Sequence, residues 1–148
     1  MAVLPTVRML FPCDDARIDL ADEKWTLHHP WGTSVVLPPG MTFPFAVPDI
    51  WVYAQLTGGV GTIDLYVELR HLPEGRLPRS IGYSNVTRLE LPGGNPWVTF
   101  DTALTIRRAP FREPGDYEFR AVAEADDGFR LLTGLSCIIR VLDLRATL

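Results

Sequence analysis

The most regular feature of the chain is an alternation of apolar and polar residues with a period of two. Between residues 62 and 70 the apolar set consists of Ile63, Leu65, Val67 and Leu69. The positions between them hold Asp64, Tyr66, Glu68 and Arg70. A period of two is the spacing of a β-strand that buries one face and exposes the other. This segment is therefore predicted to be a strand with one face in a hydrophobic core.

A second alternating segment comes just before the first. Its apolar residues are Ile50, Val52, Ala54 and Leu56, and Trp51, Tyr53 and Gln55 lie between them. Residues 57–61, with the sequence Thr-Gly-Gly-Val-Gly, have the composition of a turn. If the two segments pair as a hairpin, a loop of two or four residues places both apolar sets on one face. We therefore expect a hairpin whose outer face carries Trp51, Tyr53 and Tyr66.

Similar patterns continue along the chain, interrupted by 13 prolines and 12 glycines. Further strands are expected at residues 7–13, 24–29, 33–37, 86–91, 97–107, 117–124 and in the last part of the chain. Segments 24–29 and 33–37 are expected to pair with each other, and a β-bulge at Gly134 would correct a change of phase in the last strand. Eight or nine short strands predict an all-β fold, an antiparallel, immunoglobulin-like β-sandwich in one domain over residues 1–148. The expected core contains Val52, Ala54, Ile63, Leu65, Val67, Phe100, Leu104, Tyr117 and Phe119.

Three short stretches carry a resemblance to known proteins: residues 111–120 (FREPGDYEFR), 13–17 (CDDAR) and 56–59 (LTGG). The first looks like the Pro-Gly-x-Tyr-x-Phe entry into a late strand of many immunoglobulin-like domains, in which Gly115 provides the turn and Tyr117 begins the inward face. With the other two stretches, the whole chain resembles an uncharacterised bacterial family of small immunoglobulin-like β-sandwich proteins, a domain of unknown function. The resemblance implies the fold and transfers no site.

Composition and charge narrow the classes of partner. Hydrophobic residues make up 47% and charged residues 22% of the 148, which is typical of a globular domain. The net charge of −4 comes from interspersed residues of both signs, so a basic stripe for nucleic acid or an anionic membrane is missing. No signal peptide or membrane helix is recognisable. We therefore expect a cytoplasmic protein without nucleic-acid or membrane partners, in which the sequon Asn85-Val86-Thr87 is a chance match.

The cysteines and the clustered acidic residues are candidates for covalent or metal chemistry. Cys13 and Cys137 lie in apolar segments, so reduced, buried thiols are expected, and a disulfide between the first and last strands is the alternative. Acidic residues in two turns are candidates for calcium ligands or for caps of their own turns: Asp14, Asp15, Asp126 and Asp127. Adjacent strand residues point to opposite faces, so His28 and His29 could share a metal ion only at a bulge, and a zinc site with His71 would also need carboxylates; no metal site is therefore expected at the histidines.

The sequence contains no recognisable catalytic motif, because a nucleophile elbow, a phosphate loop and the metalloprotease signature are all missing. We therefore expect a non-catalytic protein without cofactors. The enzymatic alternative is an unrecognised hydrolase that uses loop carboxylates or His29.

The aromatic residues on the expected outer face are the main functional candidates, and the residues around them would form a polar rim: Asp64, Glu68 and Arg70. Three explanations compete: coverage by the chain's own loops, a protein interface, and stacking against sugars. The leading hypothesis is a binding or assembly module whose partner is another protein or a second copy of the chain, as in a homodimer. A carbohydrate-binding or small-ligand-binding sandwich is the alternative.

Overall fold

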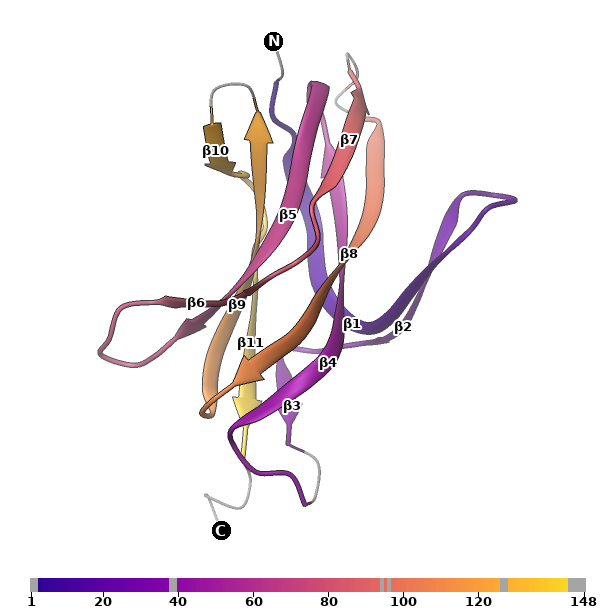
Figure 1. The fold of residues 1–148 in the computed structure, drawn as a ribbon. Coiled ribbons are helices and arrows are strands. Elements are labelled where there is room, and N and C mark those ends of the chain that lie inside the picture. Colours follow the sequence, from indigo (N-terminus) through magenta and orange to yellow (C-terminus); the bar gives the residue numbers. More distant parts are fainter. Residues whose placement is uncertain (1–2, 38–39, 94, 96, 126–127, 144–148) are drawn as a thin grey trace.

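The computed structural model describes residues 3–37, 40–93, 95, 97–125 and 128–143. Within these ranges the chain forms eleven β-strands and no helix, and the strands pack as the two layers of a β-sandwich (Figure 1). The predicted all-β sandwich is therefore confirmed. These ranges also contain no helix that is long and apolar enough to cross a membrane.

The first layer is a four-stranded antiparallel sheet with the order β2-β1-β4-β8. Its strands are β1 (Thr6–Asp19), β2 (Lys24–Pro30), β4 (Phe45–Thr57) and β8 (Thr99–Phe111). β4 and β8 pair along their whole lengths, from Phe45 opposite Phe111 to Thr57 opposite Thr99.

The second layer is a seven-stranded sheet with the order β3-β11-β9-β5-β6, in which β10 also pairs with β9 and β7 with β5. Its strands are β3 (Ser34–Val36), β5 (Val60–Leu72), β6 (Arg79–Tyr83), β7 (Thr87–Pro92), β9 (Gly115–Ala125), β10 (Gly128–Leu131) and β11 (Cys137–Leu142). All pairs in this sheet are antiparallel except β3 with β11, which is parallel.

The expected hairpin between residues 50–56 and 62–70 is wrong, because β4 and β5 belong to different sheets. The loop between them has two residues, Gly58 and Gly59, as the register argument required, but it carries the chain from one layer to the other. A glycine is needed at position 59, where φ is +85° and a Cβ would lie 2.8 Å from Leu91 Cδ1 and 3.0 Å from the Pro5 nitrogen. The apolar sets of both strands still meet, because they face each other across the sandwich core.

Two further expectations on pairing are corrected. Segments 24–29 and 33–37 do not pair with each other, since β2 pairs with β1 and β3 pairs with β11. The number of strands exceeds eight or nine because β6 was not expected and the last predicted strand is divided into β10 and β11. Short strands of this kind are defined by their partners more than by their own sequence pattern.

The last predicted strand is interrupted near Gly134, as expected, between β10 and β11. The prediction of a single-residue bulge there is wrong. After Leu132 the chain leaves β9 and contacts β1, where the Val7 amide donates to the Thr133 carbonyl and the Leu135 amide donates to the Val7 carbonyl. Gly134 has a φ of +108°, and a Cβ there would lie 2.2 Å from the Val7 carbonyl oxygen. Glycine at this position therefore allows the two layers to meet at their edges.

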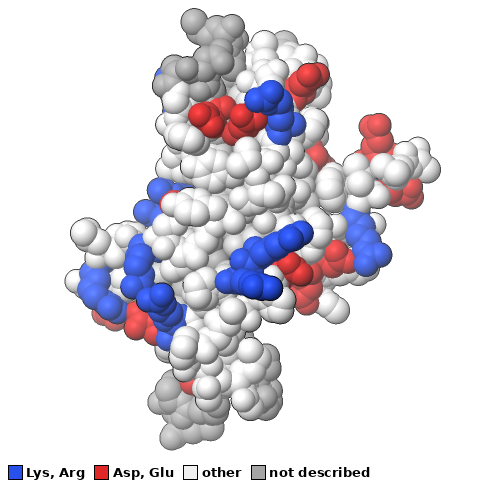
Figure 2. Space-filling view, viewed as in Figure 1, with Lys and Arg blue, Asp and Glu red and all other residues white. Residues whose placement is uncertain are grey.

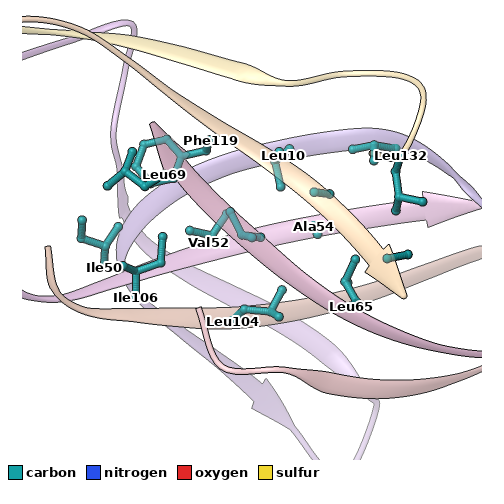
Figure 3. Packing of buried hydrophobic residues seen from close by; sticks show 14 of the residues in the cluster. Leu10, Ile50, Val52, Ala54, Leu65, Leu69, Leu104, Ile106, Phe119 and Leu132 are labelled. Carbon is teal, nitrogen blue, oxygen red and sulfur yellow. The ribbon is translucent and has the colours of Figure 1, made fainter. Parts of the chain in front are cut away.

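The core lies between the two sheets, and Figure 3 shows its central side chains. Leu10, Val52 and Leu104 come from the four-stranded sheet and pack toward Leu65 and Phe119 of the seven-stranded sheet (Figure 3). Of the nine predicted core residues, eight are buried and Phe100 is half-buried against them. The expected core is therefore confirmed, although the pairing used to argue for it is not.

The turn before β9 fixes how this strand enters the core. The Tyr117 hydroxyl donates a hydrogen bond to the Glu113 carbonyl, four residues earlier in the chain. This arrangement is the tyrosine corner found in immunoglobulin-like sandwiches. Gly115, the first residue of β9, follows this turn with a φ of +138°, and the Tyr117 side chain is buried in the core.

β1 changes partner along its length and so forms a projecting arm. Its first part pairs with β4 and its second part with β2, and Cys13 is opposite both Trp51 and Pro30 at the change. Beyond Cys13 the β1–β2 hairpin extends away from the sandwich, on the right in Figure 1. We call this hairpin, residues 14–30, the arm.

Candidate functional site

The predicted interface residues lie on two faces of the molecule instead of one. Trp51 and Tyr53 are on the outer face of the four-stranded sheet, whereas Tyr66 is on the outer face of the seven-stranded sheet. Their outward direction was predicted correctly for each strand. The single aromatic face was not, because two strands in opposite layers point their outer residues in opposite directions.

Tyr66 lies in an aromatic cluster that includes residues from two other strands. Its ring packs edge-on against Tyr83 of β6 at 5.9 Å and against Phe129 of β10 at 6.0 Å. Leu131 follows on the same face of β10, opposite Val122, which is itself opposite Tyr66. Tyr83, Phe129 and Leu131 are 57%, 64% and 54% exposed. We call Tyr66, Tyr83, Phe129 and Leu131 the aromatic patch.

The charged residues around the aromatic patch form ion pairs between neighbouring strands. Arg88 pairs with Asp64 at 3.0 Å and Arg70 with Glu118 at 2.7 Å, and Arg120 donates to Glu68. The Arg88 guanidinium keeps the pKa of Asp64 below its ordinary value. On the face shown in Figure 2, acidic and basic side chains likewise lie beside one another. The expected rim residues Asp64, Glu68 and Arg70 therefore surround Tyr66, with partners that reduce their net charge.

Sequence reasoning missed three members of the aromatic patch. Tyr83 lies in β6, whose five residues show no alternation, and its position opposite Glu68 is known only from the pairing. Phe129 and Leu131 could have been found from the sequence Asp126-Asp127-Gly128, whose composition predicts a turn between two strands. A hairpin there places Phe129 opposite Glu124 and Leu131 opposite Val122, on the outer face of β9.

A cleft lies between the outer face of the four-stranded sheet and the arm. The cleft has a volume of about 410 Å³, and its apolar walls come from the sheet and from β2: Met9, Phe11, Tyr53, Trp25 and Leu27. The charged side chains that line it are Glu23, Lys24 and Asp101. We call this cleft the arm cleft.

Tyr53 and Asp101 are joined at the floor of the arm cleft. The Tyr53 hydroxyl donates to Asp101 Oδ2 at 2.7 Å, and its ring contacts Phe11 at 5.4 Å. Burial, followed by the neighbouring Asp101 carboxylate, raises the pKa of Tyr53. Asp101 Oδ1 is buried and accepts no hydrogen bond from any described residue. This carboxylate is therefore only half satisfied.

Trp51 lies apart from the arm cleft, in a shallow hollow beside the edge of β8 that Tyr83 and Arg107 also line. Asn85 covers this edge: its side-chain oxygen accepts from the Thr105 backbone N–H, and its backbone N–H donates to the Thr105 carbonyl. The asparagine of the sequon thus satisfies the backbone of an edge strand.

A third cavity, of about 500 Å³, contains His71 and lies where β5 and β11 end and β9 begins. His71 is stacked on Tyr117 at 4.6 Å, and its Nδ1 is 3.5 Å from Glu113. Burial lowers the pKa of His71, the Glu113 carboxylate opposes that shift, and Arg79 and Arg76 add to it. None of the described residues lining this cavity carries a hydroxyl or thiol. The cavity therefore places a buried imidazole beside the Glu113 carboxylate.

The expected metal candidates are engaged in other contacts where the structure describes them. Asp14 accepts from Trp31 Nε1 at 2.9 Å and lies 3.4 Å from His29 Nδ1, and Asp15 pairs with Arg17 at 2.8 Å. Asp126 and Asp127 lie outside the described residues. In the described part of the chain, no three histidine, cysteine, aspartate or glutamate residues are placed to hold a metal ion.

Both cysteines are free thiols. Burial, together with the carboxylates of Asp14 and Asp15, raises the pKa of Cys13 to about 11, and burial also raises the pKa of Cys137. A thiol must lose its proton to act as a nucleophile, so these environments do not activate either cysteine.

Comparison with known proteins adds no functional assignment. No model of a protein family matches the chain, and a search of the curated proteins found no similar sequence. A function must therefore be inferred from the geometry of the aromatic patch and the cavities.

Proposed function

We propose that the chain is a non-catalytic assembly module that binds a protein through the aromatic patch, and that this protein is a second copy of the chain. The observation that carries the proposal is the exposure of Tyr83, Phe129 and Leu131 side by side on one sheet face. Contiguous apolar side chains on a protein surface are typical of interaction sites.

The arrangement of charges around the patch supports a protein partner. Interfaces between proteins combine an apolar centre with a polar margin, and tyrosine is enriched among the residues that contribute most to binding. Here the margin consists of paired charges of both signs. Nucleic acid would require an excess of free basic groups, so this margin disfavours it.

The same ion pairs disfavour the carbohydrate alternative. A sugar-binding site needs free polar groups that accept and donate hydrogen bonds to hydroxyls beside an exposed ring face. The carboxylates beside Tyr66, those of Asp64 and Glu68, are already bonded to Arg88 and Arg120. The rings also meet edge-on, at 63° and 74°, so Tyr66 is enclosed by its neighbours.

A second copy of the chain fits the margin because the margin contains both signs of charge. In a twofold dimer the same surface meets itself, so an excess of charge of one sign would repel its copy across the axis. The arginines and carboxylates of the margin are paired within one chain and leave no such excess. The free thiols Cys13 and Cys137 are compatible with action in the reducing cytoplasm.

The experiment measures solution mass by sedimentation between about 1 and 500 μM, the range in which modest interfaces dissociate. The wild-type chain should become heavier with concentration, and Phe129→Ser should weaken the association by about tenfold or more. Leu77→Ser is the matched control, because Leu77 is an apolar residue with 87% exposure outside the patch. It should associate as the wild type does.

Thermal unfolding of each variant keeps the result interpretable. Phe129→Ser should unfold near the wild-type temperature, because its side chain is mostly exposed. Self-association is wrong if the wild type stays monomeric over the whole range, or if Leu77→Ser weakens association as much as Phe129→Ser.

A further inference from the structure

We propose that a recess at one end of the sandwich binds a small uncharged aromatic molecule, which packs against the rings of Trp31 and Phe45. The recess has a volume of about 280 Å³ and is lined by residues of β3 and β11 from one sheet and of β4 and β8 from the other, at the lower end of the molecule in Figure 1. We call it the end recess. The aromatic patch lies on the outer face of the seven-stranded sheet, so this inference does not depend on the proposed function.

The end recess opens the hydrophobic core to solvent. Phe111 and Val141 belong to the core and are only 1% and 2% exposed, whereas Val36 and Met41 are 48% and 36% exposed. The recess therefore runs from the core to the surface, and a ligand can enter it from solvent. A ligand there removes apolar surface from water, which is the main source of affinity in concave sites of this kind. The other apolar residues of the lining are Trp31, Val35, Leu37, Phe45, Ala46, Val47 and Pro48.

The charges of the lining favour a ligand without charge. Among the described residues that line the end recess, Asp14 alone has a charged side chain. Its Oδ1 accepts a hydrogen bond from Trp31 Nε1 at 2.9 Å, and its Oδ2 lies 3.4 Å from His29 Nδ1. An anionic ligand would be repelled by this carboxylate, and a cationic one would find both of its oxygens already in contact with other groups. Moving a charge from water into an apolar site without a partner is costly, so a neutral ligand fits best.

The rings in the lining favour an aromatic ligand over an aliphatic one. Phe45 is stacked on Phe111 with ring centroids 5.4 Å apart and an interplanar angle of 14°, and Trp31 and Met41 line the same recess. Aromatic rings gain energy from offset or edge-to-face contacts with one another, and a thioether also packs favourably against a ring. An apolar cavity of about 150 Å³ is large enough to bind benzene. A volume of about 280 Å³ therefore has room for one ring or two fused rings.

The test titrates 2-naphthylmethanol into the full-length protein and follows calorimetric heat and the nuclear magnetic resonance signals of the indole N–H groups. Saturable binding with a Kd of about 1 mM or tighter is expected for a ligand of this size. The signal of Trp31, identified with the variant Trp31→Phe, should shift because this residue lines the end recess. The signals of Trp25 and Trp51 should not shift, because these residues line the arm cleft and the hollow beside β8.

Three related compounds test the chemistry of the ligand. 2-Naphthoate has the same rings with a negative charge and should bind about tenfold more weakly or not at all. 2-Naphthylmethylamine is a cation at neutral pH and should bind no more tightly than the alcohol. The fully saturated analogue of the alcohol has the same carbon skeleton without aromatic rings and should bind about threefold more weakly or less.

Three variants connect the binding to the end recess. Val36→Asp replaces an exposed apolar side chain of the lining by a charged one and should weaken the binding of 2-naphthylmethanol by about threefold or more. Phe45→Leu should weaken it by about threefold or more through loss of a ring. Val98→Asp is the matched control, because Val98 is 41% exposed and does not line the recess. It should change the affinity by less than about twofold, because exposed charges are screened by salt.

Thermal unfolding first shows that each variant is folded. The proposal is wrong if 2-naphthylmethanol does not bind saturably, or if it shifts the signals of Trp25 or Trp51 but not that of Trp31. Tighter binding of the amine than of the alcohol overturns it, as does equal binding of the saturated analogue. An unchanged affinity in both Val36→Asp and Phe45→Leu also overturns it, and so does a loss in Val98→Asp as large as that in Val36→Asp.

Discussion

The outer faces of the two sheets come from strands with the same alternating sequence pattern, but their outward side chains differ in exposure and in hydrogen bonding. On the seven-stranded sheet, the outward charges of β5 and β9 pair with each other and leave Tyr83 and Phe129 exposed. On the four-stranded sheet, Tyr53 is only 7% exposed, and within the described residues the Asp101 side chain is hydrogen-bonded only to the Tyr53 hydroxyl. The difference shows that the fate of an outward side chain depends on which strands lie beside it.

The aromatic patch and the arm cleft also differ in the chemical groups that they present to solvent. The charged residues around the aromatic patch are paired with one another. The exposed surface at its centre is therefore mainly apolar. The arm cleft differs, because its lining combines the rings of Phe11, Trp25 and Tyr53 with the Asp101 carboxylate, whose Oδ1 is buried and has no hydrogen-bond donor among the described residues.

The largest expected loss of stability is for substitutions in the core that both sheets share. Losses on the two outer faces can be compared with it. Phe119→Ala and Leu65→Ala should each reduce the free energy of unfolding by about 2–5 kcal/mol, through lost burial and the cavity left behind. Both side chains are fully buried. Urea unfolding of the two variants measures this, and losses below about 1 kcal/mol would contradict the assignment of inner and outer faces.

Replacing a tyrosine by phenylalanine on each outer face tests directly whether the two faces differ. Tyr53→Phe removes the donor to Asp101 and should cost about 1–3 kcal/mol, because a buried carboxylate loses its bond. Tyr66→Phe should cost less than about 0.5 kcal/mol, because no described residue is hydrogen-bonded to the Tyr66 hydroxyl. Unfolding of both variants under one set of conditions gives the difference. Equal losses would show that the two faces do not differ in this way.

A smaller effect is expected for the ion pairs of the seven-stranded sheet. Arg70 and Glu118 are joined at 2.7 Å but remain partly exposed, with 23% and 16% of their side chains accessible. Arg70→Gln should therefore cost at most about 1 kcal/mol, and the loss should shrink in high salt. Denaturant curves at low and high salt measure both quantities. A loss that does not depend on salt would mean that Arg70 acts through packing and not through charge.

The smallest expected effect is on the pH dependence of stability between pH 7 and 5. The pKa of His71 in the folded protein lies below its ordinary value of 6.5, so the unfolded chain binds the proton more readily. Stability should therefore fall as the pH decreases from 6.5 toward the lowered pKa. The pKa values of Asp64 and Asp116 lie below 3.8, so their ion pairs do not contribute to this slope.

The check on this pH dependence is a series of unfolding curves for the wild type and for His71→Gln. The variant should be less stable than the wild type near neutral pH, because it loses the stacking on Tyr117. Its slope between pH 7 and 5 should be flatter. A variant with the wild-type slope would assign the titration to another group.

Much of the fold could be predicted from the sequence because alternation reports burial directly. Ile63, Leu65 and Val67 face the core as predicted, and so do Val52 and Ala54, although the two strands do not pair. The face of each residue depends only on the strand's period of two and on which side is apolar. The choice of partner strand depends on energies summed over whole strands, and one chain segment does not contain that information.

The candidate sites were predictable only in part for the same reason. By itself the sequence determined the all-β class, the inner and outer faces of the long strands, and the outward position of Tyr66 among charges. Only the tertiary structure decided that Tyr83 and Phe129 lie beside Tyr66, and that Trp51 and Tyr53 lie on the other sheet. It also brought residues of the arm, Tyr53 and Asp101 together as the lining of one cleft. These contacts join residues from strands distant in sequence, and their positions are fixed by the packing of two sheets around one core.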